Sequence, residues 1–189
     1  MTISYYVRQV TLEDIKFAQE GTDVYNSAYT THDGWTTEAS IVQGKLTDKS
    51  DTEQFIYDSV KTDKLTQLFA FEKDDQGNDA HVVGTLMIVP FPDLQELPTP
   101  GEAMITRFAV SPDHQSKGLG RLLIEGSFKV MREQGYERCS IRVFENRPEI
   151  LAWYTKVGFK DTNERRAFKA PEGKKLVLPV GFVIMKLDL

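Results

Sequence analysis

The sequence predicts an α/β protein with one mixed sheet and helices on both of its faces. Two observations predict this class. Strand-like apolar segments and helical apolar periods follow one another along the chain in the order β-α-α-β-β-β-α-β-α-β-β. Near the middle, an apolar strand, a glycine-bearing turn and a long helical period are directly consecutive. The 189 residues can bury one complete core, so we expect a single domain over 1–189.

The first five elements lead into a proline-rich connection. We expect a strand over Ile3–Val10, helices over Leu12–Ala28 and Thr52–Lys61, and strands over Leu65–Lys73 and His81–Pro90. Thr11, three residues before Asp14, is an N-cap signal for the first helix. Residues 74–79 are an evident turn. Four of the eight prolines lie between residues 90 and 100, and because proline lacks the ladder donor, we expect a loop there.

The second half contains the long helix and the last strands. We expect a strand over Ile105–Val110, a helix over Leu119–Glu133, a strand over Cys139–Phe144, a helix over Ile150–Val157, and strands from Phe159 and over Val180–Leu187. Gly135 and Gly158 are placed to end the two helices. Asn146 and Glu149 form a capping-box pattern, with Pro148 in the first helical turn. The polar, basic stretch 163–179 is expected to be a loop.

The junction between the middle strand and the long helix has the parts of an anion-binding site. The first turn of a helix presents unpaired N–H groups and the positive end of the helix dipole. Glycines let a phosphate approach that backbone closely. A dinucleotide fingerprint would need glycine at Leu123, and a P-loop would need lysine at Arg121. The pattern that remains is Gln115-x-x-Gly118-x-Gly120.

This pattern resembles the pyrophosphate-binding motif of the GCN5-related N-acetyltransferase (GNAT) superfamily, [QR]-x-x-G-x-[GA]. The stretch Trp153-Tyr-Thr-Lys-Val-Gly-Phe159 is similar to the late helix motif of the same family. The segment Gly34-Trp-Thr-Thr-Glu-Ala39 resembles the first inter-helix loop of a microbial, small-molecule-type subgroup. The resemblance implies the GNAT acyl-CoA N-acyltransferase fold, with a mostly antiparallel sheet, and acetyl-CoA as the acetyl donor.

The expected cofactor-binding residues follow from the motif and from the resemblance. The turn and the helix start would wrap the pyrophosphate of coenzyme A with Gln115, Ser116, Lys117, Gly118, Leu119, Gly120 and Arg121. The resemblance implies that the backbone of Phe108, Ala109 and Val110 pairs with the pantetheine amides. It also suggests Asn146, although this residue stands eight positions before Tyr154, where seven is usual.

Tyr154 is the expected catalytic residue. In the resembled family the matching tyrosine is a general acid, and a phenol with a pKa near ~10 suits a departing thiolate. The base is open. Some family members have a glutamate eleven residues before Gln115, but Met104 stands there. Glu102 and Glu38 are the two candidates, and water chains could also serve.

Simple alternation assigns two faces to the middle strand. Glu102, Met104 and Thr106 would share one face, and Ile105, Arg107 and Ala109 the other. The acceptor is expected to meet Trp35, Glu38 and His32 in the inter-helix loop, where Trp35 offers a cation–π face.

Composition narrows the class of partner. The net charge of −5 argues against nucleic acid, which needs a basic face. The single cysteine, Cys139, excludes a disulfide framework, and no histidine pair has metal-ligand spacing, so we expect no metal. No apolar run approaches the ~18 residues of a membrane span. The first residues are strand-like rather than a signal peptide, so we expect a cytoplasmic protein with no membrane partner.

We therefore expect an N-acetyltransferase that moves an acetyl group from acetyl-CoA to a primary amine of a small molecule, by direct transfer in a ternary complex. Two alternatives stay open. One is a peptide or protein N-acetyltransferase of the same fold, and the other is a non-catalytic acyl-CoA-binding sensor. The resemblance also allows a homodimer.

Overall fold

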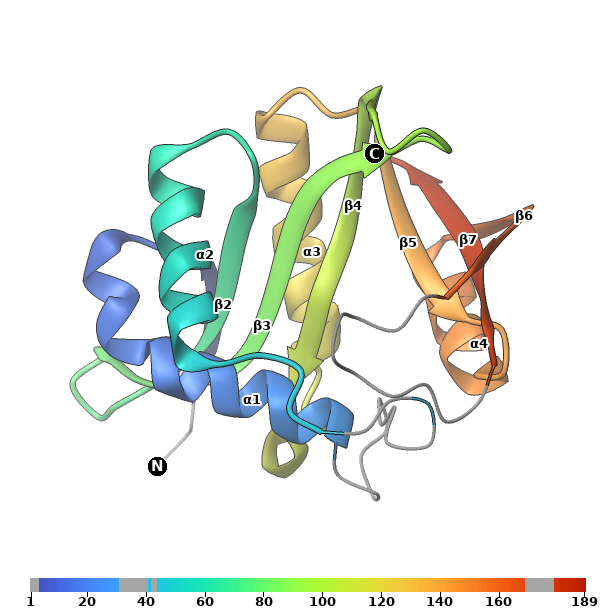
Figure 1. The fold of residues 1–189 in the computed structure, drawn as a ribbon. Helices are drawn as coiled ribbons and strands as arrows, with labels where there is room; N and C mark the ends of the chain where they lie inside the picture. The colour runs from blue at the N-terminus through green and yellow to red at the C-terminus, as the bar shows by residue number, and fades with distance from the viewer. Residues whose placement is uncertain (1–3, 31–40, 42–43, 169–178) are drawn as a thin grey trace.

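The structure, a computed structural model, describes residues 4–30, 41, 44–168 and 179–189 (Figure 1). Its strands are β1 Tyr5–Gln9, β2 Thr66–Lys73, β3 Asp79–Pro92, β4 Pro98–Val110, β5 Arg138–Phe144, β6 Lys160–Ala167 and β7 Gly181–Asp188. Its helices are α1 Ala18–Thr30, α2 Lys49–Lys61, α3 Leu119–Glu133 and α4 Pro148–Val157, with short 3-10 helices over Leu12–Phe17 and Pro112–His114. Among these helices none is long and apolar enough to cross a membrane.

All seven strands form one mixed sheet in the order β1-β2-β3-β4-β5-β7-β6. Every neighbouring pair is antiparallel except β4 and β5, which are parallel. This confirms the predicted α/β class, the mostly antiparallel sheet and the predicted element order. The parallel pair is joined by α3, because parallel neighbours need a long crossover.

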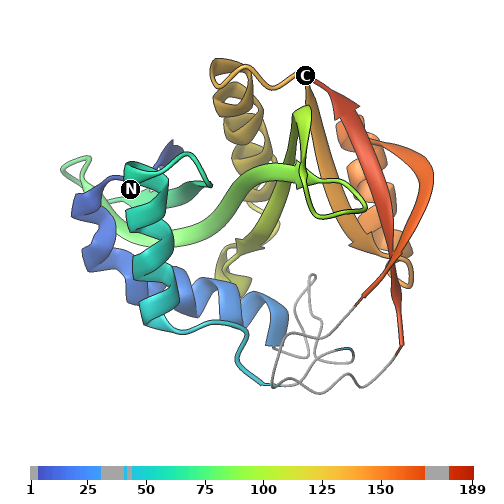
Figure 2. The same cartoon turned by 45° about the horizontal axis from the view of Figure 1, so that its top comes forward.

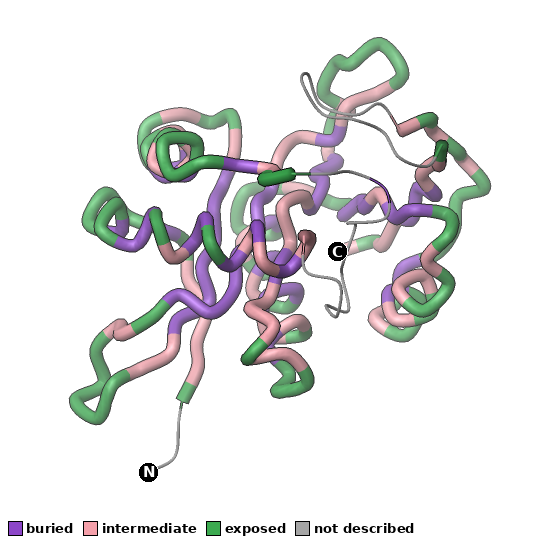
Figure 3. Tube along the Cα trace, turned by 60° about the horizontal axis from the view of Figure 1, so that its bottom comes forward, coloured by how far each residue is buried: buried purple, intermediate pink, exposed green. Residues whose placement is uncertain are grey.

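Helices cover both faces of the sheet (Figures 1 and 2). α3 and α4 lie on one face and bury the larger core, which contains Leu86, Ile105, Leu123, Ile141 and Phe159. α1 and α2 cover the other face over β2, β3 and β4, where they bury a second cluster. Figure 3 shows the buried segments along the strands and the inward faces of the helices, with the turns exposed.

A bulge in β4 shapes the middle of the sheet. Thr85 pairs with Ala109 and Met87 with Thr106, so β4 has one more residue than β3 over this stretch. Arg107 lies in the bulge with φ of 49°, and its guanidinium sits 4.0 Å from the ring centre of Tyr25. The expected alternation of faces is therefore wrong beyond Thr106, because the extra residue shifts every following side chain by one position.

β4 and β5 separate just before this bulge. Their pairing runs only from Glu102–Arg138 to Ile105–Ile141. Past it the two strands diverge, as Figure 1 shows. The backbone of β4 from Thr106 to Val110 thus has no β5 partner, and the site described below lies along this edge.

The proline-rich loop expected over residues 90–100 is largely wrong, because most of this stretch is strand. Pro92 pairs with Pro98, and only residues 93–97 form the turn of a long hairpin. β2 pairs with β3 no further than Ile88, and β5 pairs with β4 only from Glu102. The hairpin end therefore has no second neighbour, and a missing N–H there breaks no ladder hydrogen bond.

Three further expectations need correction. The first helix begins as the 3-10 turn Leu12–Phe17 and becomes α-helical only at Ala18. The basic loop expected from residue 163 is strand β6 as far as Ala167, an outer strand in which charged side chains are usual. The capping box of Asn146 does not form, because Arg147 is the N-cap of α4 and Glu149 accepts a hydrogen bond from the Arg147 guanidinium at 2.5 Å.

Candidate active site

A cavity of about 530 Å³ opens at the amino end of α3, beside the free edge of β4. It is lined by Phe108, Ala109, Val110, His114, Gln115, Ser116, Gly118, Leu119, Gly120, Arg121 and Trp153. The set contains every residue expected to bind coenzyme A except Lys117 and Asn146. These two are exposed, Lys117 in the turn and Asn146 in the turn before α4.

The backbone of the turn is shaped as a cradle. Ser116 and Gly118 both have the left-handed conformation, with φ of 62° and 81°. Gly118 is the N-cap of α3, so the first amides of the helix follow it directly. A Cβ built on Gly118 finds no atom within 4 Å, which leaves the space above this turn open. Amides at a helix start facing open space suit a phosphate group.

Side chains hold the end of β4 against this turn. The Gln115 amide donates to the carbonyl of Val110 at 3.3 Å, and the Tyr29 hydroxyl donates to the carbonyl of Phe108 at 2.7 Å. Each carbonyl has a second lone pair and can accept once more. The expected pairing of this backbone with pantetheine therefore remains geometrically open.

Trp153 and His114 complete the wall, and sequence reasoning did not assign them to the cofactor. The Trp153 ring stacks on Phe108 with centroids 6.1 Å apart, which joins α4 to β4. His114 lies 3.2 Å from the Glu72 carboxylate and meets the Tyr5 ring edge-on. The late helix motif marked Trp153 as family-typical, but its place in the wall depends on tertiary packing.

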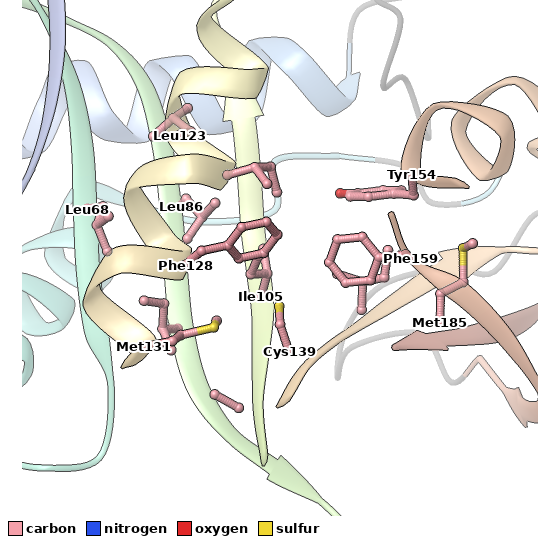
Figure 4. Packing of buried hydrophobic residues seen from close by; sticks show 14 of the residues in the cluster. Leu68, Leu86, Ile105, Leu123, Phe128, Met131, Cys139, Tyr154, Phe159 and Met185 are labelled. Carbon is pink, nitrogen blue, oxygen red and sulfur yellow. The ribbon is translucent and has the colours of Figure 1, made fainter. Parts of the chain in front are cut away.

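Tyr154 is buried beside this wall, with 8% of its surface exposed. Its ring packs edge-on against Trp153 and Phe159, with centroids 4.9 and 5.4 Å away. Figure 4 shows its hydroxyl directed away from α4, toward α3 and β4. Burial, and to a lesser extent the nearby Cys139, raise the pKa of the Tyr154 phenol, so it is a proton donor at neutral pH. Among the described residues, the cavity lining includes Trp153 but not Tyr154.

Glu102 lies on β4 outside the cavity lining. It precedes Phe108 by six residues of β4, roughly 20 Å of strand. Its carboxylate is buried and accepts hydrogen bonds from Arg138 and Lys186, both at 2.6 Å. Burial raises the pKa of Glu102, but the hydrogen bonds from Lys186 and Arg138 outweigh burial and lower it overall. This carboxylate therefore joins β4 to β5 and β7, an arrangement that favours a structural role over the expected role as base.

We expect Glu102→Gln to reduce stability without reducing the rate of the chemistry. Hydrogen bonds to charged groups contribute about 1.5–3 kcal/mol, and Arg138 is partly exposed, so the free energy of unfolding should fall by about 2 kcal/mol at pH 7. The folded-state pKa lies below the unfolded value of about 4.3. The contribution is thus present above pH 4.3 and lost as the pH falls through the folded-state value. Urea unfolding at pH 7 and pH 3 should show the difference between the two proteins shrinking. An unchanged stability with a tenfold loss of kcat would instead support Glu102 as the base.

The remaining expected residues divide into two groups. Trp35, Glu38 and His32 lie outside the described residues. Cys139 is buried, which raises the pKa of its thiol, so it is unsuited to be a nucleophile. No group of three or more His, Cys, Asp and Glu side chains that could hold a metal occurs in the described parts of the chain.

Comparison with known proteins gives the same class as the fold and the cavity. A profile described as the acetyltransferase (GNAT) family matches residues 27–159, which is more than half of the sequence. The chain therefore belongs to the GNAT acetyltransferase family.

Individual relatives are more distant. The chain is 31% identical over 67 residues to the [ribosomal protein bS18]-alanine N-acetyltransferase of Escherichia coli strain K12, a match that covers 35% of this chain and 45% of that protein. The crystal structure of a GNAT-family acetyltransferase from Streptococcus pneumoniae has a TM-score of 0.66 and 17% identity, covering 98% and 100% of the two chains. A ribosomal-protein-alanine N-acetyltransferase from Brucella melitensis has a TM-score of 0.68 and 17% identity, covering 97% and 99%. At these identities the two structures support the fold alone.

Proposed function

We propose that the protein is an N-acetyltransferase that moves an acetyl group from acetyl-CoA to a primary amine of a small molecule. One observation carries the proposal. The cavity joins a left-handed cradle at the amino end of α3 to the part of β4 that β5 leaves unpaired. A ligand with a phosphate at one end and a thin amide-bearing arm at the other fits both features.

The cofactor-binding residues have distinct tasks in this proposal. The amides that follow Gly118 meet the pyrophosphate, and the dipole of α3 adds a favourable potential. Gln115 fixes the turn against β4 through the Val110 carbonyl. The backbone of residues 108–110 takes the pantetheine arm, while Phe108 and Trp153 form an apolar wall beside it. Bound in this way, acetyl-CoA supplies the acetyl group as a thioester.

Tyr154 supplies the proton that the reaction requires. The amine nitrogen forms a bond to the acyl carbon, the carbon–sulfur bond breaks, and the Tyr154 hydroxyl gives its proton to the departing sulfur. The nitrogen loses one proton, to water or to a base, and water then restores the proton of Tyr154. Glu38 stays the candidate for that base. Holding the two reactants in line contributes several kcal/mol to catalysis.

The test is a thiol-release assay on the full-length protein with acetyl-CoA and a panel of amines. The panel contains amino acids, polyamines, arylamines, aminoglycosides and a peptide with a free N-terminus. We expect thiol release above background only when an amine is present, together with the acetylated amine in the mass spectrum. Coenzyme A binding in a calorimeter, with no turnover of any amine, would instead favour the non-catalytic sensor.

A second candidate, an N-acetyltransferase of peptides or proteins, is favoured by one comparison. The curated relative in Escherichia coli is named for acetylating an alanine of a ribosomal protein. The chain spans less than half the length of that relative, so the acceptor does not transfer with the match. Faster turnover of the peptide than of every small amine in the same panel would favour this candidate.

A further inference from the structure

Two of the three guanidinium nitrogens of Arg142, on β5, are buried without a hydrogen-bond partner among the described residues. Its Nε and Nη2 atoms are inaccessible to solvent and form no hydrogen bond within the part of the chain that the structure describes. Arginine keeps its charge in proteins, and buried polar groups are almost always hydrogen-bonded. Buried donors on a charged group, with no acceptor among the described residues, therefore indicate a missing acceptor.

Register places Arg142 on the face away from α3. Its neighbours Ile141 and Val143 pack into the core beneath α3 and α4, so Arg142 points to the other side. There it is flanked by Phe144 on its own strand and by Ile184 directly across on β7. Both belong to apolar clusters, which offer no acceptor atom.

A second unpaired group lies on the same face. The hydroxyl oxygen of Ser140 is buried and also has no hydrogen-bond partner among the described residues. Ser140 precedes Arg142 by two residues, about 7 Å along the strand. Two neighbouring polar side chains without partners, beside the apolar side chains of Phe144 and Ile184, are the lining expected of a small polar binding site.

The neighbouring charges leave this site positive. Arg166 of β6 faces the same side, and its charge adds to burial in lowering the pKa of Arg142. Two carboxylates on nearby strands are already engaged, since Glu164 accepts from Arg166 at 2.6 Å and Glu102 accepts from Lys186. Glu96 and Glu164 act on Arg142 only at longer range, in the opposite direction. Among the described residues, no carboxylate forms a hydrogen bond with the Nε or Nη2 atom of Arg142.

Arg142 also lies at the point where the two central strands part. It is the residue after Ile141, the last β5 residue paired with β4. The cavity proposed for the cofactor includes Phe108, Ala109 and Val110, which belong to the stretch of β4 that β5 leaves unpaired. An acceptor that reaches the cofactor through this opening brings its second functional group near Arg142.

We propose that Arg142 binds a carboxylate of the acceptor, so that the substrate class is small amino carboxylic acids. The inference rests on the proposed acetyl transfer. Arginine and a carboxylate form two parallel hydrogen bonds, which gives both affinity and orientation. The N-terminus of a peptide has an amide in place of this carboxylate, so the same contact discriminates against peptide acceptors.

The test compares each amino acid with its own carboxamide, in steady-state assays with acetyl-CoA. We expect the unaltered protein to prefer the acids by about tenfold or more in kcat/KM. Arg142→Gln should lower kcat/KM for the acids at least about 30-fold, mainly through KM, and leave the carboxamides within about twofold. Arg142→Lys should fall in between, because it keeps the charge and loses the planar fork. Arg165→Gln, at an exposed arginine paired with Asp161, is the matched control and should change neither class.

Several outcomes would overturn the inference. One is a preference of the unaltered protein for carboxamides, a comparison that needs no variant to fold. Others are equal losses for both classes in Arg142→Gln, or weakened coenzyme A binding in that variant, which would assign Arg142 to the cofactor. If no amine is turned over, the proposed function fails separately. Calorimetric binding of the same amino acids to the coenzyme A-loaded protein then tests the role of Arg142. We expect Arg142→Gln to lose this binding. Equal binding by the variant and the unaltered protein would overturn the proposal.

Discussion

Replacing Tyr154 with phenylalanine is expected to lower kcat at least about 100-fold and to leave the affinity for acetyl-CoA within about twofold. A positioned general acid contributes about 10²–10⁴ to the rate. The variant keeps the ring that packs on Trp153 and Phe159, so the wall of the cavity is preserved. The Tyr154 hydroxyl forms no hydrogen bond within the described chain, so the free energy of unfolding should change by less than about 1 kcal/mol.

The pH profile separates the acid role from a packing role. The acid must be protonated to act, and burial raises the Tyr154 pKa above its ordinary value of 10. The rate of the unaltered protein should therefore not fall between pH 8 and pH 10 through ionisation of this group. Single-turnover rates across that range, with a good acceptor, measure this directly.

Tyr136→Phe is the matched control for Tyr154→Phe. Tyr136 is also partly buried, its pKa is also raised by burial, and it lies just beyond the carboxyl end of α3, far from the cavity. We expect its kcat to stay within twofold of the parent. If Tyr154→Phe likewise retained more than half of the parent kcat at every pH, the thiolate would be protonated by another group.

The sequence was most informative where a structure is decided by neighbouring residues. The long helix has the predicted bounds, Leu119 to Glu133, because a glycine with positive φ stands at each end, at Gly118 and Gly135. The cradle was predictable for the same reason, since its backbone conformation and its amides belong to six consecutive residues. Most of the cavity lining was therefore identified before the fold was known.

Features that depend on distant segments were not predictable. The ion pair of Glu102 with Lys186 was not predictable, because Lys186 lies 84 residues away in the chain and nothing near Glu102 in the sequence indicates it. The bulge at Arg107 contains neither glycine nor asparagine, the residues that usually indicate a positive φ. Strict alternation therefore assigned Ala109 to the wrong face. The prolines at the β3–β4 hairpin indicated a loop. The end of this hairpin extends past the neighbouring strands β2 and β5, so a proline there interrupts no hydrogen bond to them. Arg142 went unnoticed because an arginine in a strand looks like any surface residue until its burial is known.

A leucine at Gly118 is expected to weaken coenzyme A binding at least about 100-fold, the equivalent of about 2.8 kcal/mol. The side chain would occupy the open space above the cradle, where the pyrophosphate is proposed to lie. The left-handed backbone adds a strain of about 1–2 kcal/mol for any residue with a Cβ. Loss of binding alone could therefore reflect local unfolding, so the variant needs a control with the same strain.

Gly135→Leu is that control, because the chain offers a nearly identical backbone at the other end of the same helix. Its φ is 80° against 81° at Gly118, and a Cβ at either position has no atom within 4 Å. Both variants should lose the same 1–2 kcal/mol of stability in urea unfolding, since the strain is the same. Only Gly118→Leu should lose coenzyme A in the calorimeter, because only that end of α3 presents free amides and the positive end of the dipole. Equal affinities in the two variants would place the phosphates elsewhere, and the pantetheine path along β4 would then lack its anchor.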